Sequence, residues 1–117
     1  MIQVLIANDE RAASSLLERV IGRSSDMTCV GRAYNGEEAV RMAQALRPDV
    51  VLMDLMMPIV NGIEATKQIK ETVPETFIVV NTARSDYRDR AKEAGASVVL
   101  TIPISHEAIL NAIRQVV

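Results

Sequence analysis

Short apolar runs alternate with longer stretches of helical periodicity along the whole sequence. The apolar runs cover residues 2–7, 27–33, 49–53, 76–80 and 97–102, and each is followed by a helical pattern. Their lengths are those of buried strands. Because parallel neighbours need crossover connections, this alternation predicts an α/β fold, a five-stranded parallel sheet with helices on both faces. The central runs are continuously apolar, as expected for strands buried on both sides.

Glycine, proline and polar capping residues indicate where the helices begin and end. The first helix has its apolar face at Ala12, Ala13, Leu16, Leu17, Val20 and Ile21, with Gly22 as its C-terminal cap. The other four are expected from Asn35-Gly36 to Pro48, from Gly62 to just before Pro74, over 86–94 with Gly95 as the stop, and from the cap Ser105 onward.

Length and charge favour one compact soluble domain over residues 1–117. The chain has 117 residues, a net charge of -2, 49% hydrophobic residues and 24% charged residues. Its 13 basic residues are spread among 15 acids, so no basic stripe predicts direct binding of nucleic acid or of a membrane surface.

The N-terminal segment and two single residues predict a cytoplasmic location and give no indication of a nucleophilic triad. No basic segment precedes the apolar start, and no apolar segment is long enough to span a bilayer. The single cysteine, Cys29, is expected to be a small buried hydrophobe and agrees with a reducing compartment. The single histidine, His106, is expected to be solvated in the first turn of a helix, so no Ser/His/Asp or Cys/His set is indicated.

Polar side chains follow the carboxyl ends of several predicted strands. Asp9 and Glu10 follow the first strand, Asp54 follows the third, and Asn81 and Thr82 follow the fourth. Ligands of open α/β sheets bind in the crevice at this edge. Two carboxylates brought close repel each other unless a cation bridges them, and Mg²⁺ prefers such oxygen ligands. The pattern therefore predicts a magnesium site at this edge.

The chain also carries a set of motifs at characteristic spacings. They are Val4–Glu10, Asp49–Pro58 with Asn61-Gly62 after it, Thr82-Ala83, Glu93–Ala96 and Pro103. With these motifs the chain resembles the receiver domain of two-component response regulators over essentially its whole length. The resemblance implies a flavodoxin-like fold of strand order 2-1-3-4-5.

The resemblance also implies a function and a set of site residues. It implies that Asp54 accepts a phosphoryl group from a histidine kinase or phosphotransfer protein. It implies that Asp9, Asp54 and the backbone carbonyl of Met56 hold Mg²⁺, and that the Thr82 hydroxyl reports the phosphoryl group. An Asp carboxylate can act as such a nucleophile, and the transfer needs mainly positioning and charge neutralisation. The resemblance implies that the domain is not an enzyme beyond assisting its own phosphorylation and dephosphorylation. It implies an output protein or effector domain as the partner, and it is compatible with a homodimer.

Three positions depart from the pattern of the resembled family. Asn8 replaces the first of two acids, which predicts weaker Mg²⁺ binding. Ile102 replaces a lysine that contacts the phosphoryl group, and the loss of such a hydrogen bond is worth about 1.5–3 kcal/mol. Val99 replaces an aromatic residue that turns inward on activation. The chain is therefore expected to be an atypical receiver, and Arg84, two residues after Thr82, is the cation we expect to compensate for the lysine.

An alternative interpretation keeps the receiver fold but does not involve phosphorylation. In that reading the chain is a phosphorylation-independent pseudo-receiver that binds a protein partner through its fourth helix, fifth strand and fifth helix. Ile102 favours this alternative, whereas Asp9, Asp54 and Thr82 favour the phosphoryl acceptor. A flavodoxin-like cofactor binder would need glycines in the first loop, and a dehalogenase-type phosphatase would need an acid where Met56 stands.

Overall fold

The five apolar runs form the strands of one parallel sheet. A computed structural model describes residues 1–117, and its strands lie in the order β2-β1-β3-β4-β5. They are β1 (Ile2–Ala7), β2 (Met27–Ala33), β3 (Val50–Asp54), β4 (Phe77–Thr82) and β5 (Val98–Thr101). The α/β fold class and the expected strand order are confirmed. The predicted bounds of β1 and β2 match these, and those of β3, β4 and β5 differ by one or two residues.

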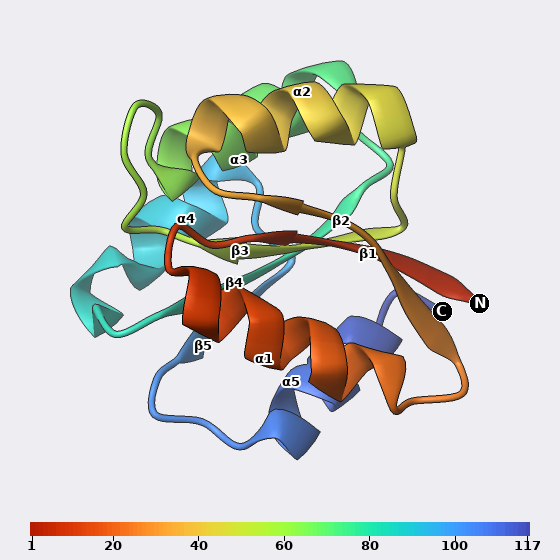
Figure 1. The fold of residues 1–117 in the computed structure, drawn as a ribbon. Helices are drawn as coiled ribbons and strands as arrows, with labels where there is room; N and C mark the ends of the chain where they lie inside the picture. Colours follow the sequence, from red (N-terminus) through yellow and green to blue (C-terminus); the bar gives the residue numbers. More distant parts are fainter.

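Helices cover both faces of the sheet. They are α1 (Arg11–Gly22), α2 (Gly36–Leu46), α3 (Gly62–Thr72), α4 (Arg88–Ala94) and α5 (His106–Arg114), with a short 3₁₀ turn, η1 (Ser85–Tyr87), before α4. Figure 1 shows α1 and α5 below the sheet and α2 and α3 above it. None of the helices is long and apolar enough to cross a lipid bilayer.

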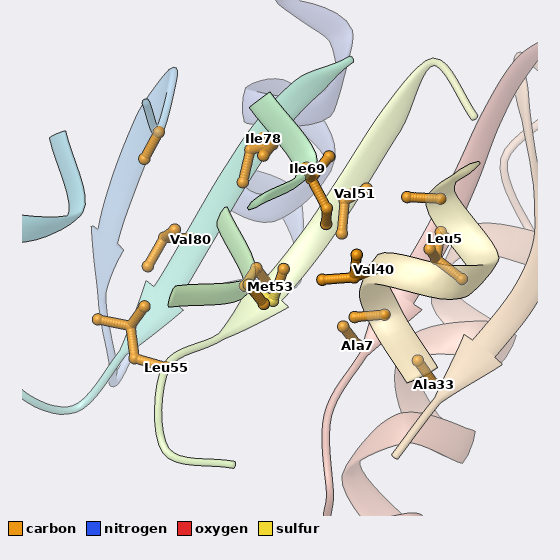
Figure 2. Close-up of a cluster of buried hydrophobic side chains, with 14 of the residues drawn as sticks. Leu5, Ala7, Ala33, Val40, Val51, Met53, Leu55, Ile69, Ile78 and Val80 are labelled. Atoms are coloured by element: carbon orange, nitrogen blue, oxygen red, sulfur yellow. The ribbon is translucent and has the colours of Figure 1, made fainter. Parts of the chain in front are cut away.

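The central strands bury side chains on both faces, which explains their continuous apolar sequence. Val51 and Met53 of β3 pack with α2, α3 and α4 in one hydrophobic cluster. Their neighbours Val50 and Leu52 pack with α1 and α5 in a second cluster. Figure 2 shows the first cluster, in which Met53 lies among side chains from the sheet and the helices above it. The strand period of two residues thus divides one apolar run between two cores.

The predicted apolar face of α1 is wrong at one edge. Leu16 is 42% exposed, whereas Ser14 is fully buried. The buried residues of α1 are Ser14, Leu17, Val20 and Ile21. The buried face is therefore rotated about the helix axis relative to the expected face, away from Leu16 and toward Ser14. Gly22 was also misassigned, because it is the last helical residue and Arg23 caps the helix in a right-handed conformation. Spacing alone did not fix the rotation of this helix about its axis.

Most of the other helix ends follow the capping signals. The side chains of Asn35, Asn61 and Ser105 each accept a hydrogen bond from the backbone N–H three residues later, at the starts of α2, α3 and α5. Gly95 ends α4 with φ 117°, as expected. The predicted helix over 86–94 is instead split, since η1 occupies its first turn and α4 begins at Arg88.

The strand order places a topological switch point between β1 and β3. The chain passes from β1 to the edge strand β2 and then returns across the sheet to β3. The loops that leave β1 and β3 therefore run in opposite directions and leave a crevice at the carboxyl ends of these two strands. Asp9 lies in the loop after β1, and Asp54 is the last residue of β3.

Candidate functional site

Asp54 ends β3 with its side chain half-buried. Its Oδ1 atom accepts a hydrogen bond of 3.3 Å from the backbone N–H of Met56. Burial raises the pKa of the Asp54 carboxyl to about 6, and the negative charges of Asp9 and Glu10 add to this increase. The backbone N–H groups of Leu55 and Met56 act in the opposite direction. No side-chain cation contributes to the shift, so negative charge is concentrated here without a neutralising partner.

Gly62 allows the start of α3 to pack directly against the backbone of Asp54. A Cβ atom at Gly62 would overlap the backbone carbonyl of Asp54 and the Cα atom of Leu55. The Gly62 N–H donates a hydrogen bond of 2.9 Å to the carbonyl of Leu55, so the helix start supports the loop after Asp54. Asn61 caps the same helix through its Oδ1 atom, which accepts from the N–H of Glu64 at 3.0 Å. The Asn61-Gly62 motif therefore positions the loop that follows Asp54.

The loop after β1 presents Asp9 to solvent and keeps Asn8 buried. The Oδ1 atom of Asn8 accepts a hydrogen bond of 2.9 Å from the backbone N–H of Glu10. This bond closes a local turn and uses one lone pair of the Asn8 amide oxygen. Asp9 is exposed, and its charge acts on Asp54.

Thr82 lies next to Asp54 in the sheet, one position beyond it. Asp54 pairs with Asn81 in the β3–β4 register, and Thr82 follows as the last residue of β4. The Thr82 side chain is fully buried, and its Oγ1 atom accepts a hydrogen bond of 3.0 Å from the N–H of Arg84. Because this bond uses an acceptor lone pair, the hydroxyl proton stays available for donation.

The end of β5 carries an apolar side chain. Ile102 is 41% exposed, and its N–H donates a hydrogen bond of 2.7 Å to the carbonyl of Thr82. The backbone therefore brings position 102 to the site, but its side chain offers no cation. Val99 is buried in the cluster above the sheet.

A cavity of about 420 Å³ opens between the loop after β3 and the start of α4. Its lining comes from the loops after β1 and β3, from the start of α3, and from η1 and α4: Asp9, Leu55, Met56, Met57, Pro58, Asn61, Ile63, Tyr87 and Arg90. Asp9 and Met56, two of the three predicted metal-binding residues, thus meet in one cavity. Sequence reasoning missed Tyr87 and Arg90, because nothing in the helical pattern shows which turn of α4 faces the site.

The side chain of Arg84 is held by Asp86, two residues later. Its Nε and Nη2 atoms donate to the two carboxylate oxygens of Asp86 at 3.0 and 2.7 Å. Its guanidinium carbon lies 4.6 Å from the centre of the Tyr87 ring. Arg84 does not line the cavity. Its expected compensating role therefore stays a prediction, with Asp86 as a competing partner.

The donor set suits a hard cation that keeps most of its water. No three His, Cys, Asp or Glu side chains come together closely enough to hold a metal ion. Mg²⁺ usually takes only one or two protein carboxylates and completes its shell with waters, carbonyls or phosphate. Asp9 and Asp54 provide these carboxylates. Burial is the main cause of the raised pKa of Asp54, and the charges of Asp9 and Glu10, which add to it, are charges that a cation would neutralise. The residues present fit Mg²⁺.

Two other single residues lie outside this site. Cys29 lies in a strand as expected, but it is half-buried in β2 and not fully buried. Its thiol donates to the carbonyl of Gly31 at 3.3 Å, and burial raises its pKa. His106 is exposed as the first residue of α5. Neither lies in the cavity described above.

Comparison with known proteins identifies the family to which this site belongs. A family model described as the response regulator receiver domain matches residues 4–114. The response regulator GacA of Pseudomonas aeruginosa is 35% identical over 99% of the chain and 55% of its own length. A protein-glutamate methylesterase/protein-glutamine glutaminase of Myxococcus xanthus is 39% identical over 92% of the chain and 31% of its own length. The chain thus spans about half or less of these relatives.

A solved structure shows the same arrangement of elements. The response regulator domain of CheB from Thermotoga maritima superimposes with a TM-score of 0.92 and is 33% identical. The match covers 99% of the chain and 96% of that domain. The likeness therefore includes the strand ends that carry Asp9, Asp54 and Thr82.

Proposed function

The chain belongs to the response regulator receiver domain family, and we propose that it accepts a phosphoryl group on Asp54. The observation that carries this proposal is a half-buried carboxylate at the end of β3, close to Asp9 and beside an open cavity. A carboxylate in this position can attack phosphorus while remaining accessible to a donor. We propose further that residues 1–117 act as a single receiver unit.

Asp54 acts as the nucleophile in its ionised form. One of its Oδ atoms attacks the phosphorus of a phosphohistidine, the phosphorus–nitrogen bond breaks, and its electron pair stays on the imidazole. Because the pKa of Asp54 is about 6, the carboxylate predominates at neutral pH. The Met56 N–H that contacts Oδ1 stabilises this ionised form.

Asp9, Asp54 and the backbone carbonyl of Met56 are the proposed ligands of Mg²⁺. When bound, the ion neutralises negative charge on the phosphoryl oxygens. Without it, the anionic donor meets the charges of Asp9 and Glu10 as well as that of Asp54. The protein residues fix the position of the nucleophile and of the loop that carries it.

Thr82 reports the state of Asp54 in this proposal. Its hydroxyl can donate to a phosphoryl oxygen because the Arg84 N–H already occupies one of its acceptor sites. Val99 offers no ring to turn inward, so any movement of Thr82 reaches the surface by another route. This is the atypical switching that we propose.

Partners and location are proposed from the family. The phosphodonor is a histidine kinase or phosphotransfer protein, and the recipient of the signal is an output protein or effector domain. We propose a cytoplasmic domain that is not an enzyme beyond assisting its own phosphorylation and dephosphorylation. It does not itself contact nucleic acid or a membrane, and a homodimer is left open.

A second function is favoured by the side chains around the site. Met56, Ile59 and Ile102 are 55%, 74% and 41% exposed, so apolar surface surrounds the acceptor position. Such a surface suits a pseudo-receiver that binds a protein partner without phosphorylation. The exposed Ile102 is the specific observation in its favour.

Intact mass spectrometry separates the two functions. With Mg²⁺ and a small phosphodonor such as acetyl phosphate, we expect wild type to gain the mass of one phosphoryl group and Asp54→Ala to gain none. Equal labelling of both proteins would remove Asp54 from the mechanism. No labelling of wild type, by small donors or by phosphorylated phosphotransfer proteins, would favour the pseudo-receiver.

A further inference from the structure

Arg90 is the only basic residue that lines the cavity beside the acceptor site. It lies on α4, across the cavity from Met56 and the other residues of the loop after β3. Asp9 and Asn61 provide the other polar side chains of the lining, and the remaining residues are mostly apolar. An anion that entered this cavity would therefore meet one cationic side chain.

The guanidinium of Arg90 forms no ion pair with a carboxylate, although its charge is one of the smaller causes that lower the pKa of Asp86. None of the five ion pairs in the structure includes Arg90. By contrast, Arg84 is tied to Asp86 by two hydrogen bonds. Arg90 lies over the Tyr87 ring, with its guanidinium carbon 5.1 Å from the ring centre. Stacking limits the positions that the guanidinium adopts and leaves its N–H donors unused.

The acceptor site needs a cation that its own strand ends do not provide. The charges of Asp9 and Glu10 already act on Asp54, and a phosphodonor brings further negative charge. At the end of β5, the exposed side chain is that of Ile102. Lysine and arginine are the side chains that offset charge on transferring phosphoryl oxygens. In the cavity, Arg90 alone can do so.

We propose that Arg90 binds the phosphoryl oxygens of the incoming phosphodonor and holds them in the cavity beside Asp54. This inference rests on the proposed function of Asp54. With an acyl phosphate, an Asp54 oxygen attacks phosphorus, the bond from phosphorus to the acyl oxygen breaks, and the acid leaves as its carboxylate with the electron pair. Arg90 donates hydrogen bonds throughout and transfers no proton, and its planar fork can contact two phosphoryl oxygens at once.

The test measures how labelling of the full chain depends on donor concentration. With Mg²⁺ and acetyl phosphate, Arg90→Ala should raise the half-saturating donor concentration about three- to tenfold, a modest effect because the side chain is exposed. Arg90→Lys should recover part of the loss. As an equilibrium measurement, inorganic phosphate should compete with the donor, and its inhibition constant should rise by a similar factor in Arg90→Ala.

A matched variant separates this role from a general effect of charge. Arg88→Ala removes the same charge from an exposed site that does not line the cavity, so it should stay within about twofold of wild type. Equal effects in Arg88→Ala and Arg90→Ala would overturn the proposal in favour of long-range electrostatics. A large effect in Arg84→Ala with none in Arg90→Ala would transfer the role to Arg84.

Failure of the proposed function can be told apart from failure of this inference. If wild type were never labelled, the acceptor role of Asp54 would fall. Binding of inorganic phosphate, followed by NMR in the presence of Mg²⁺, would still decide the role of Arg90. Equal phosphate affinity in wild type and Arg90→Ala would overturn the inference, whereas normal labelling of wild type would leave the acceptor role standing.

Discussion

The side-chain oxygen of Asn8 accepts a hydrogen bond of 2.9 Å from the backbone N–H of Glu10. An aspartate of the same shape can accept this bond as well, so the turn does not explain why the chain has an amide here. The difference lies in charge. An aspartate would add a negative charge beside Asp9, on the side of the crevice opposite Asp54.

We therefore expect Asn8→Asp to strengthen Mg²⁺ binding severalfold and Asp9→Ala to abolish it. The reason is that Mg²⁺ affinity increases with the number of carboxylates that it can contact. Titration calorimetry or NMR titration with Mg²⁺ measures both affinities. An unchanged affinity in Asn8→Asp would show that charge at this position does not limit metal binding.

The pKa of Asp54 predicts a change of stability with pH. Because the folded-state pKa is raised to about 6, the folded chain binds more protons than the unfolded chain between pH 3.8 and about 6. The contribution of the Asp54 carboxyl to folding stability is therefore lost as pH rises through this window. In Mg²⁺-free buffer, Asp54→Asn should unfold with a free energy about 1–2 kcal/mol higher than wild type at pH 7.5, discounted for partial exposure.

This difference should shrink toward zero near pH 4, where the Asp54 carboxyl is protonated in the folded chain. Urea unfolding of both proteins at several pH values measures it. Asp89→Asn, at an exposed position of α4, is the control for removing one charge. A difference that did not vary with pH would mean that Asp54 titrates normally.

Gly62 should be intolerant of even one added methyl group. A Cβ atom there would overlap the backbone of Asp54 and Leu55, which cannot move without displacing the acceptor loop. We expect Gly62→Ala to cost about 2–4 kcal/mol of unfolding free energy. Gly22→Ala is the matched control, because no atom lies within 4 Å of its Cβ position, and it should be neutral or slightly stabilising. Equal stabilities of the two variants would refute the packing argument.

A lysine at position 102 should speed phosphorylation. Ile102 is 41% exposed at the end of β5, so its replacement should change the unfolding free energy little. A charge-assisted hydrogen bond to the phosphoryl group is worth about 1.5–3 kcal/mol, so Ile102→Lys should increase the labelling rate tenfold or more. Ile102→Gln, without the charge, should have a much smaller effect. If both variants labelled like wild type, position 102 would not reach the phosphoryl group.

Sequence alone determined the kind of fold and the position of Asp54 at the end of a central strand. Alternating strand and helix patterns permit few arrangements other than a parallel sheet covered on both faces, because crossovers between parallel strands have one hand. The same rule brings residues after β1, β3 and β4 to one edge. For this reason Asp9, Asp54 and Thr82 could be placed at one edge of the sheet before any contact was known, and their shared role there stays a prediction.

Only the tertiary structure decided which residues face one another across the cavity. The rotation of α1, with Ser14 buried and Leu16 exposed, depends on packing against the sheet and is not contained in residue spacing. Arg90, in the first turn of α4, and Tyr87, in η1, line the cavity, and residue spacing does not show this. Local ion pairing decides that Arg84 turns to Asp86. The rotation of α1 and the positions of Arg84 and Arg90 depend on contacts between residues distant in sequence or on competing local partners. Periodicity and spacing, by contrast, indicate only which face of each element is apolar.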